Sequence, residues 1–386
     1  MKKKIIAFVA LMLVSLMLFS LGARLARAEG EDNAVKVNAK AYYLTDFDGT
    51  VEIASGNKEE RLPIASMVKI MTLDLVFEKI DEGAVSLADS VCVSENAASM
   101  GGSQAFLAAN SVYSVERLIK SVIVASANDS CVALAEHCSG SVDAFVAQMN
   151  EKAKMLGMNN TNFVNCTGLP ADNAYSCAVD VYKMTRELMS HDKFFDYSTV
   201  WMYDFEHPDG RKTTLTNTNK LSRFYKGCDG GKTGFTKQAG SCLSATAKRD
   251  DTRLICVVIG APSAKERNSQ VSELLNYGFA NYSDKVLYSV EEGSALTVDV
   301  EFGKTKIAGC YIEKPLTVFG KKSSSDKAEI KIEKYTVVAP VRKGDVVGKI
   351  TAISDGKEVA SADILAAENV EKRNVTDVLR EIAEKW

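Results

Sequence analysis

The sequence has little of what a metal-dependent enzyme requires. It contains only three histidines, His137, His191 and His207, which form no H-E-x-x-H pattern, and no pair of its nine cysteines is spaced as C-x-x-C. We therefore expect no metal or other cofactor, and a metallopeptidase is disfavoured. No G-x-S-x-G motif supports a Ser-His-Asp hydrolase, so each histidine is interpreted as an ordinary surface or helix-end residue.

The odd number of cysteines argues against a disulfide framework, although exported proteins commonly have one. Cys131 and Cys138 stand seven residues apart in an apolar helical stretch, which predicts that both face the core. We interpret the cysteines as small buried apolar residues. A disulfide framework is the alternative.

Acidic residues are absent from the first 28 residues, which hold five bases. A basic start at 1–4, an uncharged apolar run at 5–21 and Ala-Arg-Ala at 26–28 predict that residues 1–28 are the signal peptide of an exported protein. An uncleaved N-terminal anchor is the alternative, and no other stretch is apolar enough to span a bilayer. Removal of this segment takes the formal net charge from −3 to −8, which argues against a nucleic-acid binder.

The remaining chain suits two domains and has no internal repeats or low-complexity tracts. Residues 33–283 mix strands with helices, and helices are predicted at 66–82, 114–126, 130–138, 141–157, 178–190 and 265–283. Strands are predicted as a hairpin of 39–44 with 50–53, an antiparallel pair of 232–236 with 241–248, and a further strand at 253–259.

From about residue 285 the pattern changes. Residues 285–366 contain short β-rich runs between charged turns, at 286–290, 296–300, 316–319, 335–338 and 346–350, which predicts a small all-β domain. Residues 369–386 form a tail in which an amphipathic helix is predicted. Its apolar face would carry Val375, Val378, Leu379, Ile382 and Trp386.

Three short motifs, about 60 and then about 106 residues apart, carry the candidate chemistry: Ser66-Met-Val-Lys69, Ser126-Ala-Asn128 and Lys232-Thr-Gly234. A serine hydroxyl is a poor nucleophile and needs a base within hydrogen-bond reach. A spacing of three residues on a helix puts Ser66 and Lys69 on the same face, and a helix that begins near Ser66 would place its hydroxyl at the positive end of the helix dipole. Each motif alone fits a helix cap, a turn or a strand entry, but together they indicate a serine acyl-transfer site.

In this order the motifs resemble those of the D-alanyl-D-alanine carboxypeptidases, the low-molecular-mass penicillin-binding proteins of peptidase family S11. The flanking residues resemble that family from about residue 33 to 285, and more weakly beyond. The matching blocks are 63–72, 100–103, 121–130, 165–169, 216–221 and 230–236. The resemblance implies an α/β (α+β) serine transpeptidase/β-lactamase-like domain, with an antiparallel sheet flanked by helices, and a small C-terminal all-β domain.

The resemblance also implies a role for each motif residue. Ser66 would attack the carbonyl between the two terminal D-alanines of a peptidoglycan pentapeptide, release the last D-alanine and leave an acyl-enzyme that water hydrolyses. Lys69 would be the base, and its pKa, ordinarily about 10.4, would have to be lowered by burial or by Lys232. Ser126 would pass the proton to the leaving amine, and Asn128 would hold Lys69 or the amide of the substrate.

In the third motif, Lys232 would bind the free carboxylate of the substrate, with Thr233 as a hydroxyl partner. Gly234 would let the substrate backbone pair with the strand. The backbone N–H groups of Ser66 and Phe235 would form the oxyanion hole. Some family members have histidine at the position of Phe235, and the middle motif has alanine where glycine or aspartate is frequent.

The implied partners are peptidoglycan stem peptides ending in D-Ala-D-Ala and β-lactam antibiotics, at the outer face of the bacterial cytoplasmic membrane or in the cell wall. The family often ends in a helix that lies on this membrane, which implies peripheral membrane contact by the tail. The tail is less basic than membrane-surface helices usually are, so packing onto the β-domain and disorder are alternatives.

Two other functions remain open. A class A β-lactamase would need a glutamate on a loop between the second and third motifs and would end after the catalytic fold. A non-catalytic penicillin-sensing or wall-binding module is disfavoured by the intact set of Ser66, Lys69 and Lys232.

Overall fold

The computed structural model describes residues 35–289, 296–324, 328–354 and 356–384. The predicted signal peptide at 1–28 lies outside the described residues, and so do Val290 and Trp386.

A five-stranded antiparallel sheet organises the N-terminal part of the described chain, in the strand order β2-β1-β9-β8-β7. Its strands are β1 (Ala41–Asp46), β2 (Glu52–Gly56), β7 (Cys228–Thr236), β8 (Gly240–Arg249) and β9 (Thr252–Ala261). The predicted hairpin and the three later strands are confirmed, although their ends differ by a few residues. The third motif lies in β7, which is an edge strand of this sheet.

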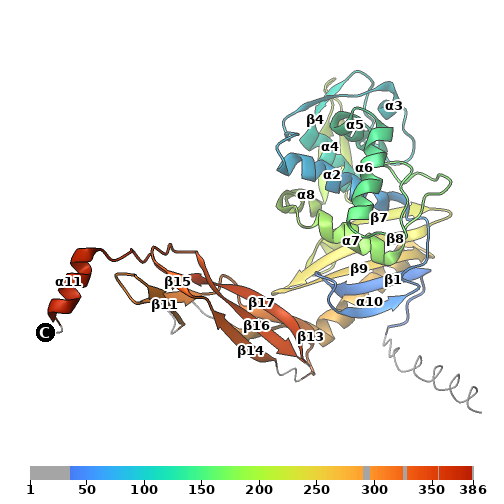
Figure 1. Cartoon of the computed structure of the whole chain (residues 1–386). Helices are drawn as coiled ribbons and strands as arrows, with labels where there is room; N and C mark the ends of the chain where they lie inside the picture. The colour runs from blue at the N-terminus through green and yellow to red at the C-terminus, as the bar shows by residue number, and fades with distance from the viewer. Residues whose placement is uncertain (1–34, 290–295, 325–327, 355, 385–386) are drawn as a thin grey trace, which may run out of the picture.

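Helices cover both faces of the sheet. Successive side chains of a strand point to opposite sides, so a strand that is apolar throughout gives both faces a surface that must be buried. In β9, Ile255 and Val257 join the core that contains the helices of the second motif, whereas Cys256 and Val258 join a second core beneath α10. Figure 1 shows α10 on one side of the sheet and the remaining long helices stacked on the other. The predicted antiparallel sheet flanked by helices is therefore confirmed.

All six predicted helices are present. The long ones are α2 (Lys69–Asp81), α4 (Val115–Ala125), α5 (Asn128–Ser139), α6 (Val142–Met155), α7 (Ala178–Leu188) and α10 (Ala264–Asn281). The short elements are η1 (Ala65–Val68), α3 (Glu95–Ala98), η2 (Asp192–Phe194), α8 (Phe195–Ser198) and α9 (Leu221–Phe224). Two small hairpins complete this part, β3 (Ser90–Cys92) with β4 (Val112–Ser114) and β5 (Met202–Glu206) with β6 (Lys212–Thr216).

The C-terminal part is all-β, as expected, and extends away from the sheet to end in α11 (Val375–Glu384) (Figure 1). Strands β10 and β13 pair with each other, and a six-stranded sheet has the order β14-β16-β17-β12-β11-β15. The bounds are β10 (Tyr282–Tyr288), β11 (Thr297–Glu301), β12 (Ile307–Tyr311), β13 (Leu316–Lys321), β14 (Glu329–Lys334), β15 (Val337–Val338), β16 (Val346–Ser354) and β17 (Lys357–Ala366).

Two histidines depart from the prediction of ordinary surface or helix-end residues: His207, and His191, which is the N-cap of η2 but is buried. His191 is buried, with Nδ1 2.5 Å from Asp81 Oδ2 and Nε2 3.2 Å from Asp74 Oδ1. His207 is buried against the hydroxyl of Tyr113, at 3.0 Å. Each ring nitrogen of the two imidazoles has a polar partner, and the partners Asp74, Asp81 and Tyr113 lie far away in the sequence. His137 does lie in the last turn of α5, as predicted.

The nine cysteines, all within the described part of the chain, are free thiols. Seven are buried, which confirms the interpretation as small core residues for most of them. Cys131 faces the core as predicted, but Cys138 is only partly buried and Cys92 is exposed. Among the described residues, no helix has the length and apolar composition needed to cross a bilayer.

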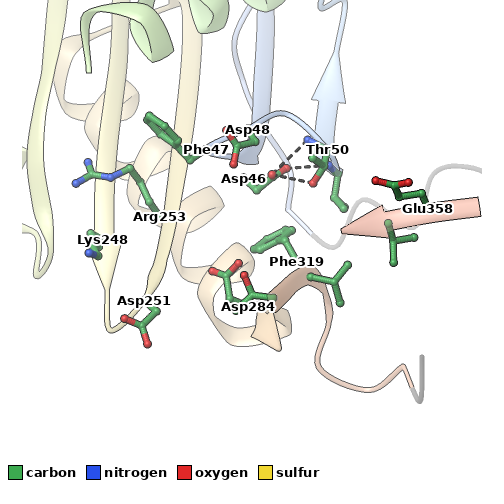
Figure 2. A pocket seen from close by; sticks show the side chains of 14 residues that line it. Asp46, Phe47, Asp48, Thr50, Lys248, Asp251, Arg253, Asp284, Phe319 and Glu358 are labelled. Atoms are coloured by element: carbon green, nitrogen blue, oxygen red, sulfur yellow. Dashed lines mark hydrogen bonds between the residues drawn. The ribbon is translucent and has the colours of Figure 1, made fainter. Parts of the chain in front are cut away.

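A cleft of about 720 Å³ opens where the turns β1–β2 and β8–β9 meet strands of the β-domain. Figure 2 shows acidic side chains around it, among them Asp46, Asp251 and Asp284, together with Phe319. Burial and the nearby charges of Asp46 and Asp251 raise the pKa of Asp284. No residue of the three motifs lines this cleft, so it is separate from the site described next.

Candidate functional site

Ser66 lies at the start of the predicted helix, but in a different local structure. It belongs to η1, a 3₁₀ turn that leads directly into α2. Ala65 has φ +49°, a left-handed conformation that few residues other than glycine adopt, so no helix continues back through it. Gly168 packs on this point so closely that a Cβ there would lie 2.0 Å from Ala65 O. Ser66 therefore follows a bend of the backbone at Ala65 whose position is fixed by close packing against Gly168.

Lys69, one turn after Ser66, is completely buried. Its Nζ lies 3.1 Å from Ser66 Oγ, which confirms that the two side chains share a face, 2.6 Å from Asn128 Oδ1 and 2.5 Å from Thr167 O. Burial lowers the pKa of Lys69 below its usual value, because a desolvated ammonium is unfavourable. The first two motifs therefore meet at Lys69 Nζ, which contacts Ser66 of the first motif and Asn128 of the second.

The second motif is a sharp junction between two helices. Helix α4 ends at Ser126, whose φ of +64° is left-handed, and α5 begins at Asn128. The amide of Asn128 is fixed on both sides, since its Nδ2 donates to Gly101 O at 2.7 Å and its Oδ1 accepts from Lys69. Ser126 Oγ is buried, and among the described residues it has no hydrogen-bond partner. A buried hydroxyl without a partner is unusual and is available to a ligand.

The third motif runs along the edge strand β7. Lys232 is buried, and its Nζ donates to Thr233 O at 3.1 Å, while Thr233 Oγ1 donates to Thr218 Oγ1 at 2.8 Å. Burial, and then the charge of Lys69, lower the pKa of Lys232 well below its usual value. Burial is the first cause of the lowered pKa at both lysines, and two ammonium groups this close disfavour each other's charge.

Gly234 has a packing role that the sequence did not reveal. A Cβ at this position would lie 2.7 Å from Ile64 O and 3.1 Å from Ser66 N. The absence of a side chain thus lets β7 approach the backbone of the turn η1, which carries Ser66. The next residue, Phe235, points its ring into solvent and is 67% exposed.

Sequence reasoning did not identify several residues that build this site. Thr167 supplies a carbonyl to Lys69, and Thr218 holds Thr233. Arg267 on α10 is buried close enough to Lys232 to affect its pKa. The blocks 165–169 and 216–221 contained the signal for the first two, but nothing in the sequence pointed to Arg267. In the described ranges, no three His, Cys, Asp or Glu side chains are grouped so that they could hold a metal ion.

This arrangement, a serine and a buried lysine at the start of one helix, an amide from a second motif and an edge strand carrying a lysine, is that of the active-site serine enzymes that bind penicillin. Comparison with known proteins makes this class specific. The family model of the D-alanyl-D-alanine carboxypeptidases (peptidase S11) matches residues 27–263, and that of the penicillin-binding protein 5 C-terminal domain matches residues 284–372.

Two relatives match over most of their length. The D-alanyl-D-alanine carboxypeptidase DacF of Bacillus subtilis is 38% identical over 90% of this chain and 90% of its own. The D-alanyl-D-alanine carboxypeptidase DacC of Escherichia coli is 33% identical over 89% and 87%. Among solved structures, penicillin-binding protein 5 of Haemophilus influenzae is 30% identical, with a TM-score of 0.67 over 88% of this chain and 99% of that one. The chain belongs to the D-alanyl-D-alanine carboxypeptidase family, peptidase family S11.

Proposed function

We propose that this protein is a serine-type carboxypeptidase that removes the terminal D-alanine from peptidoglycan stem peptides ending in D-Ala-D-Ala, through an acyl-enzyme on Ser66. β-Lactam antibiotics would acylate the same serine. Membership of the D-alanyl-D-alanine carboxypeptidase family supports the reaction. The geometry around Lys69 supports the choice of nucleophile and base, and it is the observation on which the proposal mainly rests.

A neutral lysine amine has two N–H groups to donate and one lone pair. Of the three neighbours of Lys69 Nζ, Asn128 Oδ1 and Thr167 O can only accept, so they take the two N–H groups. Ser66 Oγ, 3.1 Å from Nζ, accepts from the charged amine, and it is the one neighbour whose hydroxyl could instead donate to the lone pair of the neutral amine. Burial favours this neutral form. In the reaction that we propose, Lys69 takes the proton of Ser66 directly as the oxygen attacks the carbonyl carbon.

The unpartnered hydroxyl of Ser126 suits the second half of the step. When the C–N bond of the tetrahedral intermediate breaks, the leaving amine of D-alanine needs a proton, and a hydroxyl beside it can donate its own while it receives one from the ammonium of Lys69. Asn128 is a positioning residue in this scheme, because its Oδ1 holds Lys69 and one N–H of its Nδ2 anchors the amide to Gly101 O. Of the two roles expected for Asn128, holding Lys69 is the one that we propose.

Lys232, with Thr233, is the group that we propose for the free carboxylate of the substrate. Burial disfavours its charge, and an arriving carboxylate would reverse this, because an opposite charge nearby favours the ammonium. Arg267 adds positive potential from beneath the sheet. Only a substrate with a free terminal carboxylate can form this ion pair with Lys232, which is what an exopeptidase requires.

The oxyanion hole would be formed by the backbone N–H groups of Ser66 and Phe235. The close packing of Gly234 on Ser66 N supports this, since it brings the segment after Gly234 beside the turn η1 that carries Ser66. The absence of a side chain at Gly234 would also allow an extended substrate to pair with the edge of β7.

The two alternative functions have less support. The segment after the second motif offers Lys69 a backbone carbonyl, Thr167 O, and block 165–169 contains no glutamate of the kind that a class A β-lactamase uses for fast deacylation. The C-terminal β-domain also argues against that class. A non-catalytic sensing module would not need Lys69 poised on Ser66.

The proposal is tested by two measurements on purified protein. Incubation with a pentapeptide ending in D-Ala-D-Ala should release free D-alanine, and a labelled penicillin should attach covalently to Ser66, as located by peptide mapping. Ser66→Ala should abolish both. Labelling that persists in the folded variant would mean that another residue is the nucleophile.

The division of the chain is also part of the proposal: a signal peptide at 1–28, a catalytic domain at 33–283, a β-domain at 285–366 and a tail at 369–386. The two family models, which match 27–263 and 284–372, support a boundary near residue 284. In α11 the side chains of Val375, Leu379 and Ile382 are exposed, which supports peripheral contact of an exported protein with the membrane surface. Loss of vesicle binding on deletion of 369–386 would test it.

A further inference from the structure

Phe106 combines two features that rarely occur together. Its backbone has φ +63°, in the left-handed region that large side chains seldom adopt. Its ring is 55% exposed, and no aromatic or cationic partner of this ring is found among the described residues. The packing of the ring therefore does not explain the conformation of the backbone.

Hydrogen bonds on both sides fix this conformation. The buried carboxylate of Asp129 accepts from Ala105 N at 3.0 Å and from Leu107 N at 3.1 Å, so it bridges the two neighbours of Phe106. Arg211 Nη2 donates to Phe106 O at 2.9 Å from the turn of the β5–β6 hairpin. A rare conformation that is held this firmly is most often found at functional sites.

The loop that carries Phe106 is part of the wall of the site. Asp129 directly follows Asn128, whose N donates to Ser103 O at 2.7 Å. A Cβ on Gly102 would lie 2.9 Å from Asn128 Nδ2 and 3.7 Å from Leu169. The loop thus runs over the second motif and past the segment that holds Lys69, and it carries the exposed ring of Phe106.

We propose that Phe106 contacts the stem peptide on the acyl side of the scissile bond and thereby contributes to substrate specificity. This inference rests on the proposed function. On the leaving-group side the substrate has one residue, which ends at the carboxylate site of Lys232 and Thr233. All other residues of the stem peptide lie on the acyl side, so a ring further out on the wall meets that part. The contacted chemistry is aliphatic, because a phenyl ring gains by covering methyl and methylene groups.

The test compares a long and a short substrate in the full-length protein. One substrate is the pentapeptide ending in D-Ala-D-Ala, and the other is N-acetyl-D-Ala-D-Ala, which lacks the outer residues. We expect Phe106→Ala to reduce kcat/KM for the pentapeptide roughly 10-fold, the size of a lost apolar contact, and to have a much smaller effect on the short substrate. Phe106→Gly should behave in the same way without loss of thermal stability, because glycine suits the left-handed backbone.

Phe302 provides a matched control, because it has φ +57° and is 53% exposed but lies in the β-domain, where Arg373 covers its ring. Phe302→Ala should leave both substrates unaffected. Equal losses of Phe106→Ala on both substrates would show that the residue only supports the loop, and no loss on either would show that it makes no contact. Either result overturns the proposal.

A second comparison keeps this inference separate from the proposed function. Acylation by benzylpenicillin, whose 6-amino group carries a phenylacetyl side chain, should slow more in Phe106→Ala than acylation by 6-aminopenicillanic acid, whose 6-amino group carries none. An unmutated protein that released no D-alanine would contradict the carboxypeptidase reaction, but this pair of β-lactams would still decide the role of Phe106.

Discussion

Gly234→Ala is the substitution for which the structure makes the sharpest prediction. The added methyl group would lie 2.7 Å from Ile64 O and 3.1 Å from Ser66 N, where ordinary contact begins at 3.4 Å. The nearest atom is backbone and cannot rotate away. Strand β7 and the turn η1 would therefore have to separate by about 0.7 Å at this point. This displacement moves the backbone N–H of Phe235 away from the place where it would meet the oxyanion beside Ser66.

A misplacement of about 1 Å in a reacting assembly costs on the order of 100-fold in rate, so we expect acylation by a labelled penicillin to slow by roughly 10- to 100-fold. Overpacking of this kind also destabilises a fold by about 1–3 kcal/mol, which should lower the melting temperature by several degrees. The second-order acylation rate and a thermal unfolding curve measure the two effects. The protein should still be folded at 25 °C.

Gly309→Ala is a suitable control, because its added Cβ would meet only Ala367, at 3.8 Å, in the β-domain. It should change neither the acylation rate nor the melting temperature appreciably. If Gly234→Ala acylated within about 3-fold of the unmutated protein, the spacing between β7 and η1 would not control the chemistry, and our account of the oxyanion hole would be refuted.

Three further predictions concern charged groups. Lys69→Arg keeps the charge but cannot lose its proton near neutrality, so penicillin acylation should fall by several orders of magnitude in a folded protein; near-normal acylation would place the base elsewhere. Lys232→Ala should reduce cleavage of a peptide with a free terminal carboxylate roughly 100-fold or more, and should affect the same peptide with an amidated terminus much less; equal losses would show that Lys232 acts only on the base. Burial opposes the charge of His191, but hydrogen bonds to Asp74 and Asp81 outweigh it and raise its pKa above 6.5. The imidazolium therefore stabilises the fold fully below about pH 6.5, and this contribution is lost as pH rises through the raised pKa. The melting temperature of the unmutated protein should fall over this range more than that of His191→Gln, and parallel curves would contradict the assignment.

The sequence by itself determined the order of the elements and the pairing of Ser66 with Lys69. Both depend on local sequence. Apolar residues at helical spacing define α2, the continuous apolar run at 254–259 is typical of a buried strand such as β9, and residues three positions apart on a helix share a face. Composition was equally decisive for the all-β segment at 285–366, where no helical period occurs before the amphipathic tail. The roles of the motif residues, the signal peptide and the membrane contact remain predictions that the experiments above can test.

Only the tertiary structure decided which residues from distant parts of the sequence meet at the site. The carbonyl of Thr167 meets Lys69 across 98 positions of sequence, and Gly234 packs on Ile64 across the whole catalytic fold. The sequence was misleading for His191 for the same reason, because the two aspartates that permit its burial lie on α2, more than 100 residues earlier. A local pattern reports which face of an element is apolar, but it does not report which distant polar group will satisfy a buried one. That depends on how the helices and the sheet pack together.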